Sequence, residues 1–448
     1  MVNPRELFEE IIPWIQRQRW YPRGVKDWSI VDSWRINEFY MAILKAGRLK
    51  LFIPLVLSNR APQLSPEKVF KFRGYYVYEA EYSLKFFNEL IWKNNRIKVC
   101  WKLGKVSFDR IKPLTSSYTN TLVILFSGSK RYVYKAYRII SSNNFEPRFL
   151  TYLRNRDYVP KVFLTTCLGE YYAGILLEFL DHVADGGYPF YLNARESLKG
   201  VKKILDIEID SVVRTLADFH YIMSRCSHKW CKARNAGEAD IEKWFKRILK
   251  YYNLALKVFK GESLQLLKEF DLEDVRRRMN IFRSRRILRI HQDFHLGQIL
   301  YTKEGKFVII DFEGEIARPN KDRGLLEPAV RDLAGLLRSL GYIAFFALKD
   351  HLKTSIEETF NALKGSEGEV VRKWAWKTAN SFIERYFKYT SNSSISIHGV
   401  SNCDLDEWGL EACKIWRIER SLYEIVYETR FRPNYTYIPL LGLVDYLP

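Results

Sequence analysis

The character of the sequence changes part-way along the chain, and this change constrains the fold most. Up to about residue 180, short segments rich in aromatic and β-branched residues alternate with Gly, Pro and Asn, which favours strands. From about residue 195 onward the pattern is helical, broken only between Ile287 and Glu315. Strands first and helices later predict an α+β protein with two lobes.

The predicted elements divide the strand-rich part into two groups. One helix, 4–19, accompanies the first strands, and a hairpin with its turn at 127–130 opens the second group. A helix over 143–155 and an apolar strand over 173–180 follow. The predicted strands before them are 39–44, 49–53, 75–78, 121–126 and 132–137.

We therefore predict three parts in a chain of 448 residues, a length that suits two to four domains at about 150 residues each. A first part with one helix and a group of strands covers residues 1–105, and a second group of strands covers residues 106–182. A large helical part covers residues 183–448.

The chain is strongly basic, with 72 Lys and Arg against 52 Asp and Glu, a net charge of +20. Such a balance is compatible with nucleic acid, an anionic membrane or a polyanionic ligand. The one local cluster, seven arginines within 276–289, is interpreted as the end of an amphipathic helix over 275–282, where cations complement the helix dipole. No recognised nucleic-acid motif accompanies the cluster, so we expect no nucleic-acid partner.

The six cysteines lie far apart, without the dense spacing of a secreted disulfide framework. We expect idle thiols in a reducing, cytoplasmic compartment. Cys226, His228 and Cys231 offer at most three metal ligands and lack the paired spacing of a zinc site. The first residues show no signal peptide, and apolar runs such as 51–57 and 341–348 fall short of the ~20 residues that a membrane-spanning helix needs.

Residues 287–313 carry the pattern that is most specific for chemistry. An apolar strand leads into a polar loop, and two further apolar segments, 299–301 and 307–310, flank residues 303–306. This arrangement predicts a β-hairpin directly after the loop.

The geometry of that hairpin brings polar side chains together. If the turn is centred between Glu304 and Gly305, Gln298 lies opposite Asp311 at the open end, beside the loop that bears Asp293. Two oxygen ligands at a strand end suit a hard cation such as magnesium, and the nearby carboxylate can accept a proton from an attacking hydroxyl. Kinases use this layout, and the alternative is an ordinary hairpin with a solvated polar loop.

The remaining parts of a kinase are sought upstream. Lys135 lies inside an apolar strand and either meets a phosphate or carboxylate, or sits at the wet face of the sheet. The loop 115–121 offers backbone N–H groups and hydroxyls to a phosphate, with Thr119, Asn120 and Thr121 as candidates, or is a plain polar turn. The strand end from Glu178 to Leu180 is the candidate hinge that binds adenine.

Three runs, HQDFHLGQIL (291–300), VIIDFEGEIARP (308–319) and VRDLAGLLRS (330–339), resemble the maltokinase family. That family belongs to the aminoglycoside-phosphotransferase-like branch of the protein-kinase-like fold. Further similarity lies at Arg19-Trp20, 119–121, 215–220 and 423–433, so the likeness spans most of the chain.

The resemblance implies an ATP- and magnesium-dependent maltokinase with a bilobal protein-kinase-like fold. In such a fold, residues 1–105 would be an N-terminal cap subdomain, residues 106–182 the nucleotide-binding lobe, and residues 183–448 the helical lobe with the catalytic loop and the sugar site. Such an enzyme phosphorylates the anomeric hydroxyl of maltose to maltose 1-phosphate for glycogen or α-glucan biosynthesis, with coupling to trehalose and α-glucan enzymes. It also implies that Glu146 pairs with Lys135. The sequence departs from the family pattern at Gln292, where the family usually has Gly, and after Arg19-Trp20.

The residues that contact the sugar are harder to choose from the sequence. The helix 416–430 places Tyr423, Glu424, Tyr427 and Glu428 on one side, as a pocket for a disaccharide needs. Equally, the two tyrosines pack into the core with the glutamates outside.

Other roles also stay open at this point. His295 is either a structural hydrogen-bonding group or a substrate contact, whereas Arg331 and Asp332 buttress the catalytic loop through an ion pair. Rival functions are a kinase of another sugar, such as glucosamine or trehalose, and a non-catalytic kinase-like binding protein.

Overall fold

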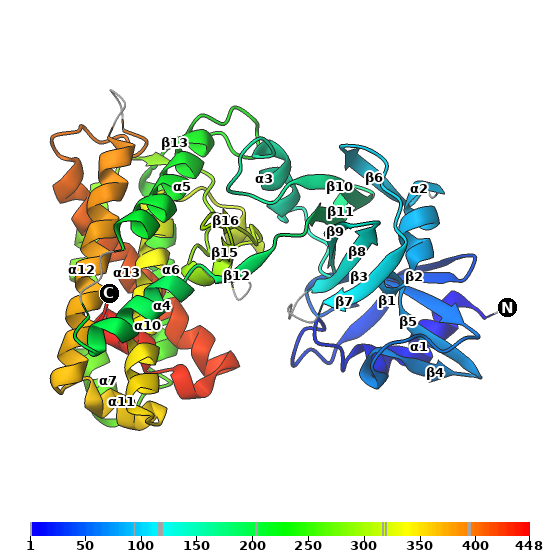
Figure 1. The fold of residues 1–448 in the computed structure, drawn as a ribbon, viewed down its shortest axis with the longest axis horizontal. Coiled ribbons are helices and arrows are strands. Elements are labelled where there is room, and N and C mark those ends of the chain that lie inside the picture. The colour runs from blue at the N-terminus through cyan, green and yellow to red at the C-terminus, as the bar shows by residue number, and fades with distance from the viewer. Residues whose placement is uncertain are drawn as a thin grey trace. The chain divides into compact units, whose positions relative to one another are not determined.

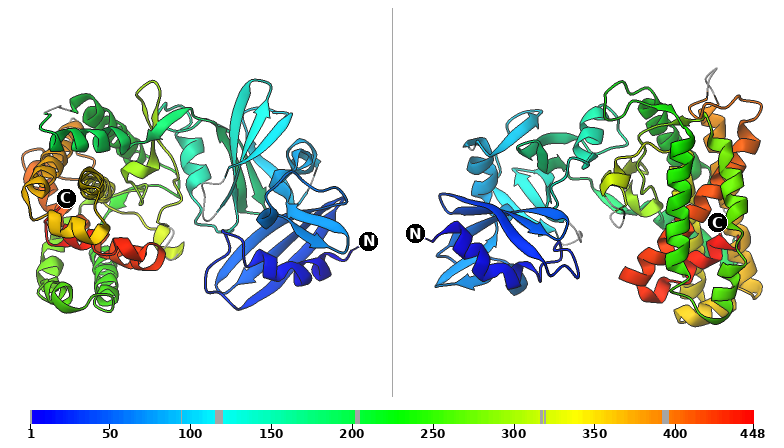
Figure 2. Two further views of the ribbon diagram at one scale, coloured as in Figure 1. Left: turned by 60° about the horizontal axis from the view of Figure 1, so that its bottom comes forward. Right: turned by 180° about the vertical axis from the view of Figure 1, so that it is seen from behind.

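The protein forms two compact units, Met1–Leu180 and Asp181–Pro448, in a computed structural model (Figures 1 and 2). The structure describes residues 2–448 except 94, 115–119, 202–204, 316–317, 319 and 392–395, and it leaves out the side chains of 320 and 321. The first unit is rich in strands and the second is mainly helical. This confirms the predicted α+β class and the large helical C-terminal region.

Two antiparallel sheets make up most of the first unit. Their strand orders are β1-β2-β3-β5-β4 and β6-β10-β11-β9-β8-β7. The strands are β1 (Trp28–Ile36), β2 (Phe39–Ala46), β3 (Leu49–Ser58), β4 (Phe70–Phe72), β5 (Tyr75–Glu79), β6 (Ile97–Lys102), β7 (Arg110–Leu114), β8 (Asn120–Ser127), β9 (Lys130–Tyr137), β10 (Val162–Leu168) and β11 (Tyr171–Glu178), and the helices are α1 (Pro4–Ile15), α2 (Ile91–Lys93) and α3 (Glu146–Tyr152).

The five-stranded sheet is covered on both faces. On one face, Leu7 and the other apolar residues of α1 pack in a core with Tyr40 and Leu44 of β2. On the other face, Met41 of the same strand joins a core that contains Tyr134 of the six-stranded sheet. Because side chains alternate along a strand, β2 reads as a nearly continuous apolar run.

The predicted domain boundary at residue 105 stays a prediction, but the assignment of one strand to the cap is corrected. Strand β6 lies in the predicted cap, yet it pairs with β10 in the six-stranded sheet. The predicted hairpin of the second group is confirmed, because Ser127 pairs with Lys130 and Gly128 takes the left-handed φ of +60° that such a tight turn requires.

A buried ion-pair cluster joins the two sheets. Arg138, directly after β9, is fully buried and pairs with Glu79 and with Glu81, the latter at 2.8 Å. The indole N–H of Trp20 donates to Glu79 at 3.0 Å, and Arg138 also donates to the hydroxyl of Thr121 at 2.9 Å. Since each buried charge has an opposite partner, the cluster ties the loop after α1 to the start of β8.

Four of the six cysteines form disulfides, so the expectation of idle thiols is wrong for them. Cys100 of β6 is bonded to Cys167 of the neighbouring β10, and Cys226 is bonded to Cys231. The first pair is 67 residues apart, so sequence spacing gives no sign of it. The bond between Cys226 and Cys231 uses up both sulfur ligands of the possible metal clip. The cysteines therefore give no support to the expected reducing compartment.

The second unit combines long helices with a small sheet of order β12-β15-β16. Its strands are β12 (His182–Asp185), β13 (Arg234–Asn235), β14 (Arg286–Ile287), β15 (Ile299–Thr302) and β16 (Phe307–Ile309). Its helices are α4 (Tyr188–Leu198), α5 (Asp206–Ser224), α6 (Glu238–Ala255), α7 (Gly261–Lys268), α8 (Leu272–Arg278), α9 (Asn320–Arg323), α10 (Val330–Leu352), α11 (Ile356–Ala362), α12 (Ser366–Thr390), α13 (Leu405–Phe431) and α14 (Ile438–Leu443).

Helix α10 lies at the centre of the helical part and packs on α4, α12 and α13. It is buried along most of its length, which explains its long apolar stretch. Among the described residues, every helix is too short or too polar to span a lipid bilayer.

Three of the seven arginines in the basic cluster at 276–289 lie in the last turn of a helix, as predicted, whereas the other four follow the helix and Arg289 is buried. Helix α8 ends at Arg278, whose guanidinium pairs with Glu411. Arg286 and Arg289 donate to backbone carbonyls of Ser224 and Trp230. These arginines therefore stabilise the local fold.

His398 provides a test of how burial affects stability. Its ring packs against Tyr386, Phe387 and Trp408, and neither ring nitrogen has a hydrogen-bond partner in the described part of the chain. Burial, reinforced by His220 nearby, lowers the pKa of His398 to about 3. The folded protein therefore holds this imidazole neutral, whereas the unfolded chain takes up a proton near pH 6.5.

We expect His398 to make the protein less stable as the pH falls from about 6.5 toward 3. The loss is about 1.4 kcal/mol per pH unit, or about 2 kcal/mol at pH 5. Chemical denaturation of the wild type and of His398→Phe at pH 7 and pH 5 measures it, with exposed His228→Phe as the control. An unchanged stability difference between wild type and His398→Phe at the two pH values would contradict this assignment.

Candidate active site

The loop between β14 and β15 is held by one buried carboxylate. Asp332, in the first turn of α10, accepts hydrogen bonds from the backbone N–H groups of His291 at 2.7 Å and Gln292 at 2.8 Å. His220 of α5 lies 3.2 Å from the same carboxylate. Asp332 therefore buttresses the loop as predicted, but through backbone donors rather than an ion pair, whereas Arg331 pairs elsewhere.

Gln292 occupies a backbone conformation that favours glycine. Its φ is +70°, in the left-handed region, which explains why the family that this run resembles usually has Gly here. The side chain compensates in part, because its amide donates to the carbonyl of Leu325 at 3.0 Å.

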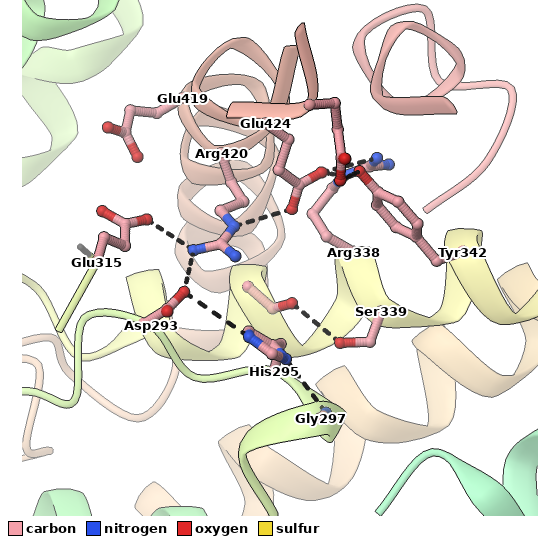
Figure 3. Close-up of polar contacts among 12 residues, drawn as sticks. Asp293, His295, Gly297, Glu315, Arg338, Ser339, Tyr342, Glu419, Arg420 and Glu424 are labelled. Carbon is pink, nitrogen blue, oxygen red and sulfur yellow. Dashed lines mark hydrogen bonds and ion pairs between the residues drawn. The ribbon is translucent and has the colours of Figure 1, made fainter. Parts of the chain in front are cut away.

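Asp293 lies next to Gln292, and its carboxylate is paired with Arg420 of α13. Arg420 Nη1 lies 2.8 Å from Asp293 Oδ1 and 2.6 Å from Glu315 Oε1 (Figure 3). Its Nε donates to Glu424 Oε1 at 2.8 Å. The guanidinium thus joins three carboxylates and fixes the orientation of Asp293.

Nearby charges and burial control the protonation of Asp293 and His295. Burial works toward a higher pKa of Asp293, but the charge and hydrogen bond of Arg420, together with His295 and His291, outweigh it and hold the pKa below its usual value. Burial likewise lowers the pKa of His295, against the attraction of Asp293, so the imidazole is neutral at pH 7. The backbone N–H of Gly297 donates to His295 Nδ1 at 3.1 Å, which leaves the proton on Nε2, 3.9 Å from Asp293.

The three-carboxylate group belongs to a larger buried network of charges. Glu315 also pairs with Arg318 and, at 2.7 Å, with Arg331. Glu419 of α13 accepts from Arg318 at 2.7 Å and lies 2.9 Å from Arg247. Because the network contains both signs in similar numbers, charges that are costly to bury alone are tolerated around Asp293.

The hairpin β15–β16 differs by one residue from the predicted register. Ile299 pairs with Ile309, so Gln298 lies across from Ile310 and not from Asp311. The turn is centred on Glu304, because Gly305 takes a φ of +76° and closes a loop of three residues rather than two. A shift of one residue turns each side chain to the other face of the strand, so the predicted pairing of Gln298 with Asp311 across the hairpin was wrong.

Gln298 and Asp311 are nevertheless in contact. The amide of Gln298 donates to Asp311 Oδ2 at 3.3 Å. Asp311 follows β16 with a φ of +62°, and this left-handed residue lies outside the strand ladder. The two side chains therefore lie together, and their amide and carboxylate oxygens are the donors that magnesium prefers.

Lys135 in the first unit meets the carboxylate that the family resemblance implies. Its Nζ lies 2.8 Å from Glu146 Oε2, and the hydroxyl of Tyr137 donates to the same oxygen at 2.7 Å. Lys135 is 8% exposed on β9, an inner strand of its sheet, so the alternative of a lysine on a wet face is wrong. An ion pair of this kind holds the lysine that clamps phosphates in kinases.

The predicted phosphate loop is only partly described. Thr119 lies outside the described residues, and Asn120 and Thr121 begin β8. The hydroxyl of Thr121 donates to Glu79, so this side chain belongs to the Arg138 cluster rather than to a phosphate site. Its role as a phosphate ligand is corrected on this ground.

The candidate hinge residues lie at the end of the first unit. Strand β11 ends at Glu178, which is exposed and exchanges hydrogen bonds with Lys161 through its backbone N–H and its carboxylate. Leu180 is the last residue of that unit and is half-buried. A contact of either residue with adenine stays a prediction.

The candidate sugar residues on α13 fit neither sequence interpretation completely. Tyr423 is buried against Tyr251, as the core alternative predicts. Glu424 and Glu428 are also buried, which the same alternative excludes. Tyr427 is half-buried, so it is the most accessible of the four candidates.

Both glutamates are engaged inside the protein. Glu424 pairs with Arg338 at 3.1 Å in addition to Arg420. Glu428 accepts from Tyr342 at 3.1 Å and pairs with Arg432 at 2.6 Å, and burial raises its pKa.

Sequence reasoning missed Arg420. A local signal existed, because Arg420 and Glu424 are four residues apart on one helix and can pair. Its contact with Asp293 joins positions 127 residues apart, and no local pattern predicts it.

The described geometry agrees with a comparison of the sequence with known families. The model of APH, the phosphotransferase enzyme family, matches residues 110–348, which is more than half of the 448 residues. The chain belongs to this phosphotransferase family. The matched region contains Lys135, Asp293 and Asp311, and membership confirms the predicted phosphotransferase class.

Similar proteins include two named glucosamine kinase. The one from Streptacidiphilus jiangxiensis is 25% identical over 219 residues, 48% of this chain and 44% of that protein. The one from Mycolicibacterium smegmatis (strain ATCC 700084 / mc(2)155) is 32% identical over 120 residues, 26% of this chain and 30% of that protein. The aligned region of this chain therefore spans less than half the length of either relative.

Solved structures support the fold of this phosphotransferase. Glucosamine kinase in complex with glucosamine, ADP and inorganic phosphate has a TM-score of 0.66 at 17% identity, covering 96% of both chains. A second structure, crystal form B of glucosamine kinase, has a TM-score of 0.68 at 17% identity, covering 95% of this chain and 96% of that chain. At this level of identity the likeness concerns the fold.

Proposed function

We propose that this chain is an ATP-dependent sugar kinase, which transfers the γ-phosphoryl group of ATP to a sugar hydroxyl. The observation that carries the proposal is the contact of Gln298 with Asp311 after the loop that holds Asp293. Family membership supports a phosphotransferase, and this group of side chains supplies a base and oxygen ligands for a metal.

Each residue takes a role that its surroundings support. Asp293 is ionised at neutral pH and accepts the proton of the attacking hydroxyl while the new P–O bond forms and ADP leaves. Lys135, held by Glu146, binds phosphate oxygens. Gln298 and Asp311 would hold magnesium, which neutralises charge on the phosphates when it is bound.

Two acceptors are candidates. The names of the relatives support glucosamine, and the motifs that resemble the maltokinase family support maltose and the product maltose 1-phosphate. An ammonium group gains most from carboxylates in excess of local cations. Asp293, Glu315 and Glu424 share Arg420, and Glu419 and Glu428 pair with other arginines, so this cluster offers little unpaired negative charge to an ammonium group, which favours maltose over glucosamine.

A phosphorylation screen tests the proposal and separates the acceptors. The purified chain is incubated with ATP, magnesium and either maltose, glucosamine, trehalose or glucose, and the products are identified by mass and by the position of the phosphate. We expect a phosphorylated sugar with matching ADP release. ATP-dependent product from none of the sugars would favour a non-catalytic binding protein.

Asp311→Asn tests the metal role. We expect magnesium-dependent nucleotide binding to weaken by roughly ten-fold or more, because the change removes a formal charge from the ligand set. Titration of nucleotide with and without magnesium measures it, and Glu304→Gln in the exposed turn of the same hairpin is the control. Unchanged magnesium dependence in Asp311→Asn would remove the basis for this site.

A further inference from the structure

A second candidate binding site lies in the first unit, in the segment between α1 and β1. Residues 16–19, 21–26 and 28 line a cavity of about 580 Å³. This volume suits a small molecule, since ligand pockets are commonly about 300–1,000 Å³. The proposed kinase function assigns no role to this cavity.

The cavity is lined by cations. Arg17, Arg19, Arg23 and Lys26 contribute to its wall and are exposed, and none of its lining residues is acidic. The neighbouring Asp27 is exposed and is not part of the wall. Several like charges on a concave surface create a strong positive potential that a bound anion relieves.

Two of these cations lack an internal structural role. Arg23 and Lys26 form no ion pair with an acidic side chain in the parts of the chain that the structure describes. Tyr21, also in the wall, is buried, and its hydroxyl has no hydrogen-bond partner among the described residues. A buried hydroxyl without a partner is uncommon, and together with the cations it indicates a ligand rather than an internal contact.

The segment is held in place from its inner side. Trp20 is buried and donates to Glu79, which is itself paired with the fully buried Arg138. The exposed arginines on either side of Trp20 and Tyr21 therefore project from an anchored backbone. Preorganised cations bind an anion at a lower entropic cost than a mobile loop does.

We propose that this cavity binds a small anion with two or more phosphate groups. Arginine favours such a ligand, because its planar guanidinium binds phosphate oxygens in pairs, and the amides of Gln16 and Gln18 add donors. Trp28 offers an aromatic face at the same wall.

The probe is inorganic pyrophosphate, titrated calorimetrically into the full chain without added magnesium. We expect Arg23→Gln/Lys26→Gln, called the cap variant here, to weaken binding by about ten-fold or more, because charge-assisted hydrogen bonds are lost. The control is Arg276→Gln/Arg277→Gln, which removes the same charge from exposed positions on α8. The cap variant should keep its thermal stability and any sugar-kinase activity, so this test is independent of the proposed function.

Three results would overturn the proposal. The first is that pyrophosphate does not bind. The second is that both double variants weaken binding equally, which indicates an effect of net charge alone. The third is that the cap variant leaves binding unchanged, which places the anion elsewhere. Single-stranded DNA is titrated in parallel. If the cap variant weakens DNA binding but not pyrophosphate binding, the surface serves nucleic acid instead.

Discussion

Replacing Asp293 with asparagine is expected to lower the turnover number of sugar phosphorylation by about a thousand-fold, while the affinity for nucleotide changes little. Asparagine keeps the size of the side chain and an oxygen that can accept from Arg420. The substitution therefore removes mainly the proton acceptor and leaves Lys135, Gln298 and Asp311 in place. Turnover and the dissociation constant of nucleotide are measured on the same preparation.

The same experiment includes its own control. A loss of nucleotide affinity as large as the loss of turnover would show that Asp293 binds nucleotide rather than a proton. The pH profile adds a second readout, because Arg420 holds the pKa of Asp293 below its usual value. This carboxylate should therefore cause no titration of the wild-type rate between about pH 5 and pH 8.

Replacing Arg420 with methionine is expected to reduce the free energy of unfolding by about 3–5 kcal/mol. Methionine fills similar space but leaves Asp293, Glu315 and Glu424 without the cation that they share. Those carboxylates are largely buried, so water cannot replace the lost charge. Chemical denaturation of the wild type and the variant measures the loss.

Arg430→Met is the matched control, because Arg430 lies on the same helix and is exposed. It should change the free energy of unfolding by about 0.5 kcal/mol or less. Equal effects of the two substitutions would contradict a special role of Arg420. In Arg420→Met the pKa of Asp293 should also rise, which moves the acidic limb of the rate profile to higher pH.

Asp293 has to meet two requirements that oppose each other. A base must be ionised, yet a buried carboxylate without a partner tends to take up a proton. Arg420 resolves this conflict by supplying a fixed positive charge. Because the same guanidinium also contacts Glu315 and Glu424, the orientation of Asp293 depends on helix α13 as well as on its own loop.

The sequence by itself determined the features that depend on short stretches of chain. Alternating apolar residues and the turn at Gly128 determined the hairpin β8–β9, and helical periodicity determined the long helices of the second unit. Such features follow from local backbone preferences and from side-chain period. The burial of an ammonium in an apolar strand left the partner of Lys135 open, and only the family resemblance implied that it is Glu146.

Only the tertiary structure decided the contacts between distant segments. The register of β15–β16 depends on the left-handed conformation of Gly305, and the pair of Arg420 with Asp293 depends on how α13 packs beside the catalytic loop. The disulfide between Cys100 and Cys167 depends likewise on strand order. Local composition does not specify these neighbours, because packing of the whole core chooses which elements lie side by side.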